Sequence, residues 1–233
     1  AQENLEVASI YSVANAQHTF GQRPFRAPHH TASAIALVGG GSQPKPGEIT
    51  LAHLGVLFLD ELPEFDRKVL EVLRQPLESK EIVISRAARQ MTFPANFQFI
   101  AAMNPCPCGY AFNQDSRCQC SPESIQRYQN RISGPLLDRI DLHIDVPPLQ
   151  ANELQERTPS ENSETVRQRV MKAYQQQIQR QQCLNQALSP TLLEQYACLD
   201  DSSSKIIEMA QQRLNLSARA YHRVLRVART IAD

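Results

Sequence analysis

The feature that most constrains the fold is an unbroken apolar run ending in two acids, "GVLFLDELPEFD", residues 55–66. Val56 to Leu59 are consecutive apolar residues, which is how a strand reads when both of its faces are buried in a parallel sheet. The run therefore predicts an α/β fold whose sheet is covered by helices. Asp60 and Glu61 follow at its carboxyl end, where α/β proteins bind their ligands. Two acids at that place indicate a metal ion and an activated water, and hence a bound phosphate.

Length and charge narrow the class of protein. The 233 residues suffice for one large or two modest domains, and 24 basic residues balance 24 acidic ones. Net charge therefore gives no support to nucleic-acid binding, which would need a local basic patch. No apolar run approaches the ~18 residues of a membrane span, and the N-terminus has no signal-peptide pattern. Because the chain lacks a starting Met, we expect a piece of a longer cytoplasmic protein.

The order of apolar periodicities and turn residues predicts two domains. We expect a helix over 1–17, a strand over 56–60, a helix over 64–79 that Pro76 kinks or ends, and a hairpin over 81–97. A buried strand ending at Asn104, a helix starting at Ser121 and a strand over 140–146 follow. After two prolines only helical patterns remain. We therefore place the boundary at 148–150, with an α/β core over 1–148 and a helical domain over 149–233.

Four cysteines fall within fifteen residues, "CPCGYAFNQDSRCQC": Cys106, Cys108, Cys118 and Cys120. In a chain without a secretory signal, clustered cysteines favour a metal over disulfides. The spacing is C-x-C, nine residues, C-x-C, which is tighter than the commoner C-x2-C knuckle. The alternative is a loop of reduced thiols, and we favour a structural Zn²⁺ site. Cys183 and Cys198 lie in helical patterns and are expected to fill the core.

Several motifs carry a resemblance to a known family. "VLFLDE" resembles a Walker B strand, "FIAAMNPCPCG" a sensor-1 strand and "GPLLDRIDL" an arginine-finger segment. Together with "RPFRAPHHTAS", they resemble the ComM/YifB group, the magnesium-chelatase-like competence proteins of the AAA+ ATPases. The resemblance covers nearly the whole chain and implies a P-loop NTPase-like core, a helical lid, and ATP and Mg²⁺ as cofactors. The family's G-x-x-x-x-G-K-[ST] loop is not present, so we expect the chain to be a fragment truncated before it.

The resemblance gives roles to the polar residues at the strand ends. It implies that Asp60 holds Mg²⁺, that Glu61 orients the attacking water, and that Asn104 acts as sensor 1 on the phosphate or the water. An acidic strand end that caps the next helix is the alternative for the acids. For Asn104 the alternative is an Asx turn before Pro105.

Two arginines receive roles in the same way. Arg139 matches the arginine finger, which acts on the ATP of a neighbouring subunit and so implies a ring. A salt bridge to Asp138 or Asp141 competes with that role. Arg219 matches sensor 2, with a solvated basic face as its alternative.

Arginines at the hairpin tip are candidate DNA contacts, namely Arg86 and Arg89. Weaker candidates lie in the proline-rich loop: Arg23, Arg26, His29 and His30. Two adjacent histidines without further ligands seldom make a metal site, so we expect His29 and His30 to be structural.

The resemblance implies a hexameric, ATP-driven motor on DNA, acting in helicase or branch-migration steps of transformation and recombination. The isolated fragment is expected to be inactive. Two alternatives within the class of ATPases are a magnesium-chelatase subunit and a Lon-like ATPase. An alternative from another class is an interaction module that zinc stabilises and that does not turn over ATP. The resemblance also places a central strand upstream of Ala1, between the strand ending at Asn104 and that over 140–146, so we expect a gap in the sheet.

Overall fold

The computed structural model describes residues 2–41, 44–86, 89–111, 117–147 and 161–233. These residues form two compact units, which divide between Ile140 and Asp141. The expected boundary at 148–150 falls on residues outside the described ranges and stays a prediction.

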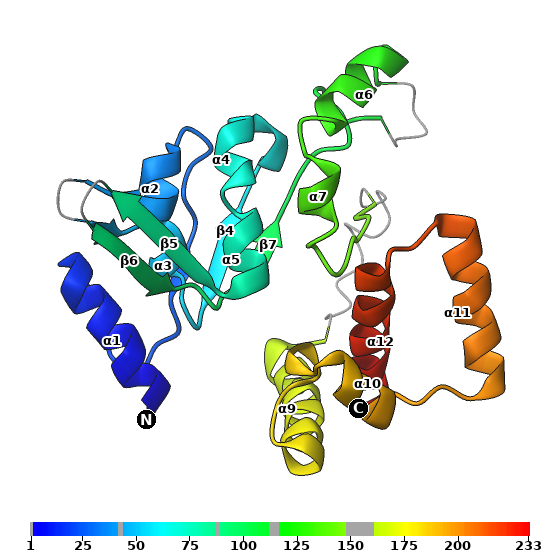
Figure 1. The fold of residues 1–233 in the computed structure, drawn as a ribbon. Helices are drawn as coiled ribbons and strands as arrows, with labels where there is room; N and C mark the ends of the chain where they lie inside the picture. Colours follow the sequence, from blue (N-terminus) through cyan, green and yellow to red (C-terminus); the bar gives the residue numbers. More distant parts are fainter. Residues whose placement is uncertain (1, 42–43, 87–88, 112–116, 148–160) are drawn as a thin grey trace. The chain divides into compact units, whose positions relative to one another are not determined.

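The first unit alternates short helices and strands (Figure 1). Its helices are α1 (Gln2–Ala14), α2 (Ala34–Val38), α3 (Glu48–Leu51), α4 (Arg67–Glu71), α5 (Arg74–Ser79), α6 (Pro122–Gln129) and α7 (Gly134–Leu137), with a 3-10 turn η1 (Leu62–Glu64). Its strands are β1 (Phe25–Arg26), β2 (Gly39–Gly40), β3 (Lys45–Pro46), β4 (Val56–Leu59), β5 (Glu81–Arg86), β6 (Arg89–Pro94) and β7 (Gln98–Ala101).

The predicted α/β fold is confirmed by a three-stranded parallel sheet in the order β1-β4-β7. The apolar run forms the middle strand, where Leu57 and Leu59 are fully buried while Val56 and Phe58 are partly exposed. Gly55 lets β4 approach β1 closely, because a Cβ at this position would lie 2.0 Å from the carbonyl oxygen of Pro24. One face of β4 thus anchors the core of the unit.

Apolar side chains from the flanking elements complete that core. They come from α2, α3, the α4–α5 region, the β5–β6 hairpin and α7, and include Leu37, Ile49, Leu70, Leu73, Ile82, Phe93 and Leu136. Fixing both ends of β4 among these side chains also fixes the two acids that follow it.

Two local predictions are confirmed in detail. The hairpin pairs Ile82 with Phe93 and Ile84 with Met91 in an antiparallel register. Helix α6 begins with Ser121 as N-cap, whose hydroxyl accepts a hydrogen bond from the Ser124 N–H, and with Pro122 as the first helical residue.

The single helix expected over 64–79 is wrong. The chain forms η1 and α4, breaks at Val72 and Leu73, and restarts as α5 at Arg74. Pro76 therefore lies in the first turn of α5, where a missing N–H costs no intrahelical hydrogen bond. The break also lets Leu73 reach the core, where it is fully buried.

The strand expected over 140–146 is also wrong. Residues 141–147 have no regular secondary structure and are exposed, including the apolar side chains of Leu142, Ile144 and Val146. An isolated extended segment has unpaired backbone groups that bond to water, so an apolar pattern alone does not make a strand. Within the described residues no strand pairs with this segment.

The second unit contains the expected helices, α9 (Ser163–Gln181), α10 (Pro190–Tyr196), α11 (Asp201–Leu214) and α12 (Ala218–Ala232), with a 3-10 turn η2 (Asn185–Ala187). Leu188, Leu193 and Leu225 form its small core, against which Cys183 packs. Cys198 is exposed, so its expected place in the core is wrong. In the described part of the chain, no helix combines the length and apolarity that a membrane crossing requires.

Candidate functional site

The two acids at the end of β4 sit in a sharply turned piece of chain. Glu61 adopts the left-handed conformation (φ 52°, ψ 45°), and its N–H donates to Oδ1 of Asp60 over 2.9 Å. A non-glycine residue in this conformation costs about 1 kcal/mol, so the surrounding packing must hold it there. Both carboxylates are exposed and available to a ligand.

The buried strand expected to end at Asn104 is wrong in both respects, because β7 ends at Ala101 and its side chains are exposed or only partly buried. Asn104 follows three residues later, beyond the same edge of the sheet. The N–H of Ala102 donates to the carbonyl of Leu59 over 2.9 Å, and the Leu62 N–H donates back to the carbonyl of Ala102 over 3.0 Å. Parallel strands in this register bring their carboxyl ends together, so Asp60, Glu61 and Asn104 share one edge. Oxygen ligands for a hard cation and an amide donor for an anion are thus gathered there.

The chain after Asn104 folds back on it. A Cβ on Gly109 would lie 3.9 Å from the side-chain oxygen of Asn104, and the Gln129 amide donates to the carbonyl of Pro105 over 3.0 Å. Burial raises the pKa of Tyr128, a buried residue of α6. Asn104 is therefore braced by the cysteine loop on one side and by α6 on the other.

The structure adds a residue that the sequence analysis treated as structural. His30 places Nδ1 3.0 Å from Oε2 of Glu61. The two are far apart in sequence, and nothing in the local pattern around His30 signals this contact. His29 instead bonds Thr31, with 3.0 Å between its Nδ1 and Oγ1 of Thr31.

Arg139 is engaged within its own unit. Its Nη2 lies 2.6 Å from Oε2 of Glu78, its Nη1 donates to the carbonyl of Pro135, and its side chain is 13% exposed. Neither Asp138 nor Asp141, the partners considered from sequence, makes this salt bridge. The finger role of Arg139 stays a prediction.

The basic side chains of α12 have partners in the second unit. Arg223 pairs with Asp141, Arg226 donates twice to the carbonyl of Leu188, and Arg229 pairs with Asp233. Arg219 lies exposed in the first turn of α12 and also makes an interaction. Arg223 and Arg226 are therefore not simply solvated, and the sensor-2 role of Arg219 stays a prediction.

The hairpin brings the backbones of Arg86 and Arg89 opposite each other, in register across the two strands. The tip between them, residues 87–88, lies outside the described residues. Their role in DNA binding stays a prediction.

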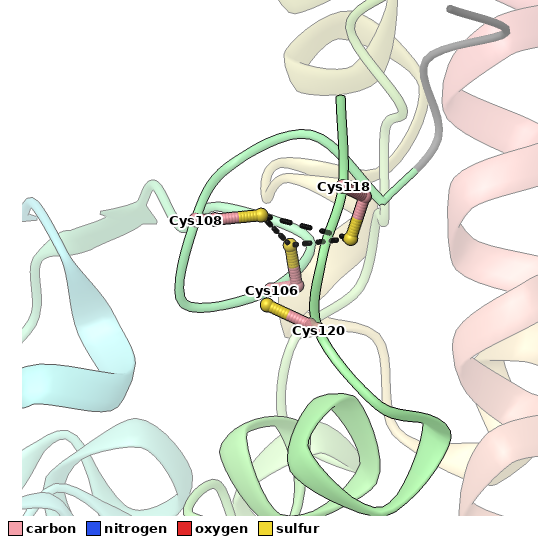
Figure 2. Close-up of side chains that lie close together, drawn as sticks. All are labelled: Cys106, Cys108, Cys118 and Cys120. Carbon is pink, nitrogen blue, oxygen red and sulfur yellow. Dashed lines mark hydrogen bonds between the residues drawn. The ribbon is translucent and has the colours of Figure 1, made fainter. Parts of the chain in front are cut away.

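The four clustered cysteines converge in space, as Figure 2 shows. Their sulfur atoms all lie within 4.8 Å of one another, and the thiol of Cys106 is 3.3 Å from that of Cys108 and 3.8 Å from that of Cys118. In a tetrahedral zinc site with Zn–S of about 2.3 Å, sulfurs lie about 3.8 Å apart. All four are free cysteines, so the cluster fits a metal ion and is not a disulfide pair.

The thiols perturb one another as a ligand set does. A hydrogen bond from the Tyr110 backbone, and then the thiol of Cys106, lower the pKa of Cys108 to about 6. The backbone of Cys120 lowers the pKa of Cys118, but desolvation and the thiols of Cys108 and Cys106 raise it more, to about 12. Cys108 thus has a lower pKa than Cys118, as expected where neighbouring thiols compete for negative charge.

These features define an α/β protein with acids and an amide at the carboxyl edge of a parallel sheet, followed by a helical unit. Comparison with known families identifies the class. The sequence profile of magnesium chelatase subunit ChlI matches residues 1–154, and that of its C-terminal region matches residues 160–233. The chain belongs to the magnesium chelatase subunit ChlI family, a branch of the AAA+ ATPases.

Relatives place it within that family, in the ComM/YifB group. Competence protein ComM of Haemophilus influenzae is 52% identical over 99% of this chain, and YifB of Escherichia coli is 49% identical over all of it. Rv2897c of Mycobacterium tuberculosis is 40% identical over 99% of the chain. The chain spans about half the length of these relatives, 46% to 47%.

Proposed function

We propose that the protein is an ATPase in which the carboxyl edge of the β1-β4-β7 sheet carries the hydrolytic residues. The observation that carries this proposal is that Asp60 and Glu61 directly follow β4, while Asn104 follows the neighbouring parallel strand β7 at the same edge of the sheet. Family membership supports it, because AAA+ proteins use an acid pair and a polar sensor at these positions.

Each residue has a proposed role in ATP hydrolysis that follows from its side-chain chemistry. Asp60 keeps its Oδ2 free of partners among the described residues and would hold Mg²⁺, which supplies neutralising charge for the phosphates when it is bound. Glu61 presents an exposed carboxylate that accepts a hydrogen bond from the attacking water and orients it. Asn104 donates its amide to the phosphate or the water from the neighbouring strand. Arg139 and Arg219 are proposed as finger and sensor 2.

Replacement of Glu61 tests this assignment. In the full-length protein, Glu61→Gln should abolish steady-state ATP turnover while leaving ATP binding close to that of the wild type, because the amide no longer orients water as a carboxylate does. Glu64→Gln is the matched control, since Glu64 is an exposed acid three residues further on that pairs with Arg131 over 2.8 Å. Equal turnover in wild type and Glu61→Gln would overturn the proposal.

We further propose that this turnover drives a hexameric ring on DNA, in helicase or branch-migration steps. Similarity to the competence protein ComM supports this, as does the pairing of Arg86 with Arg89 across the hairpin. Replacing both arginines by Gln should remove DNA stimulation of ATP turnover while leaving turnover without DNA unchanged. The same DNA stimulation in this double variant would exclude the hairpin as the DNA contact.

A second proposed function is a structural zinc site at the four cysteines. The loop that the metal would close runs from Cys106, two residues after Asn104, to Cys120, directly before the N-cap of α6. Bound metal would shorten the free length of this loop and so stabilise the position of Asn104 and of α6. The cluster geometry supports this role independently of any turnover.

Measurement of the zinc content of the purified protein tests the proposed zinc site. We expect one zinc per chain in the wild type and none after Cys108→Ser combined with Cys118→Ser. Cys183→Ser combined with Cys198→Ser is the matched control, because these cysteines lie in the second unit, outside the cluster. Zinc retained by the first pair of substitutions, or absent from the wild type, would contradict the proposal.

A further inference from the structure

The proline-rich loop after β1 delivers a histidine to the glutamate at the end of β4. Strand β1 pairs with β4 in parallel, Phe25 opposite Val56, so the chain leaving β1 emerges at the edge that carries the acids. Four residues after the end of β1, His30 places Nδ1 3.0 Å from Oε2 of Glu61. The His30 side chain is 30% exposed and that of Glu61 is 54% exposed.

The contact fixes the proton on His30. An ionised carboxylate only accepts hydrogen bonds, so Nδ1 of His30 must carry a proton and donate it to Glu61. At His29 the Nδ1 atom instead accepts a hydrogen bond, from the Thr31 N–H over 3.3 Å. Adjacent histidines thus make different hydrogen bonds, and only His30 faces the acid.

Neighbouring rings hold His30 in this orientation. The His29 ring lies with its centroid 4.0 Å from that of His30, and Phe65 meets His30 edge-on at 6.4 Å. Phe65 is a buried member of the core, so the imidazole rests against a fixed surface. A donor restrained in this way selects one conformation of the flexible glutamate side chain.

We infer that His30 is a positioning residue for Glu61, an inference that rests on the proposed ATPase function. His30 engages Oε2 and leaves Oε1 without a partner among the described residues, so the second oxygen is available to accept from the attacking water. The left-handed backbone of Glu61 and the hydrogen bond from His30 together restrict where that oxygen can lie. The loop that contains "APHH" would then belong to the hydrolytic site.

Three variants of the full-length protein test the role through the position of the donor. His30→Ala removes the donor and should lower kcat about 10- to 100-fold with little change in KM, as loss of an outer partner of a functional group does. His30→Asn places an amide N–H near the position of Nδ1 and should restore most of the rate. His30→Gln places it near Nε2 and should not. His143→Ala, at an exposed histidine of the second unit, should match the wild type.

A binding measurement separates positioning from general damage. His30→Ala should bind ADP as the wild type does but bind ADP with aluminium fluoride more weakly, because only the latter complex requires an oriented water. Wild-type turnover in His30→Ala, or Asn and Gln variants that behave alike, would overturn the inference. Faster turnover in His30→Ala would also overturn it, by showing that His30 restrains Glu61 in an inactive position. An active Glu61→Gln would overturn the proposed function itself, whereas an inactive one beside an unaffected His30→Ala overturns only the inference.

Discussion

Arg139 is held by Glu78 and by the carbonyl of Pro135, yet its Nε is buried without a hydrogen-bond partner in the described part of the chain. Arg74, Arg223 and Arg229 also have a buried guanidinium nitrogen without a partner in that part of the chain, so this feature does not separate a finger from a salt bridge. In the proposed finger role, Arg139 would exchange its contacts for an anion of a neighbouring subunit.

We therefore expect Arg139→Ala and Glu78→Gln to differ. In the full-length protein, Arg139→Ala should lower ATP turnover about 10³-fold or more with nucleotide binding retained, since a finger acts in the transition state. Glu78→Gln removes the observed partner but leaves the guanidinium, so turnover should persist. Steady-state kinetics and ATP binding measure both quantities.

Mixed rings provide the control for this prediction. Arg139→Ala subunits mixed with Glu61→Gln subunits should regain part of the activity, because some interfaces then combine an intact arginine with an intact glutamate. If both Arg139→Ala and Glu78→Gln lowered the midpoint of thermal unfolding equally and left ATP turnover unchanged, Arg139 would only form a salt bridge with Glu78 and would not act as a finger.

At the scale of elements, a buried acid joins the end of α12 to α9. Both oxygens of Asp233 accept hydrogen bonds from Arg180, over 2.5 and 2.9 Å, and Asn185 donates to Oδ2 over 2.9 Å. The Asp233 side chain is only 1% exposed. The hydrogen bonds from Arg180, assisted by Asn185, lower the pKa of Asp233 to about 2.

The lowered pKa predicts an acid-sensitive helical unit. A carboxyl whose pKa is lower in the folded state stabilises that state above its unfolded pKa, near 4, and stops doing so as the pH falls through about 2. The loss amounts to about 2 kcal/mol. Hydrogen exchange of the α12 amides should show reduced protection at pH values below about 3. Asp233→Asn should remove most of that pH dependence, whereas Asp145→Asn, at an exposed position, should not. An identical acid response in Asp233→Asn would contradict the assignment.

The 233 residues lack one component that the proposed site would need. No G-x-x-x-x-G-K-[ST] loop occurs in the 233 residues, so the backbone N–H groups and the lysine that hold the β- and γ-phosphates have no counterpart. Asp60, Glu61 and Asn104 offer polar groups for a metal ion and a phosphate, but they do not enclose the phosphates.

We accordingly expect the isolated chain neither to bind ATP tightly nor to hydrolyse it. Isothermal titration of the chain with ATP and Mg²⁺ should show no low-micromolar binding, and the full-length protein measured alongside should show it. Low-micromolar binding by the isolated chain would mean that other residues can hold the phosphates.

The sequence alone was sufficient for features that depend on neighbours along the chain. The apolar run before Asp60 predicted a strand of a parallel sheet, although only one face of β4 is fully buried instead of both. The two apolar arms over 81–97 predicted a hairpin, and Ser121 with Pro122 predicted a helix start. Motif spacing was also sufficient for the family. Strand pattern, turn chemistry and capping act over a few residues, so they can be read from local order.

Contacts between side chains that are distant in sequence could not be predicted and came from the packing of separate elements. Glu78 rather than Asp138 or Asp141 binds Arg139, and His30 contacts Glu61 although the sequence indicated only a weak DNA-contact or structural role for it. The exposed segment 141–147 also shows that local sequence does not predict strand pairing. Alternating apolar residues form a strand only where a partner strand makes hydrogen bonds to their backbone. Such contacts depend on how separate elements pack in three dimensions, and no local periodicity contains that information.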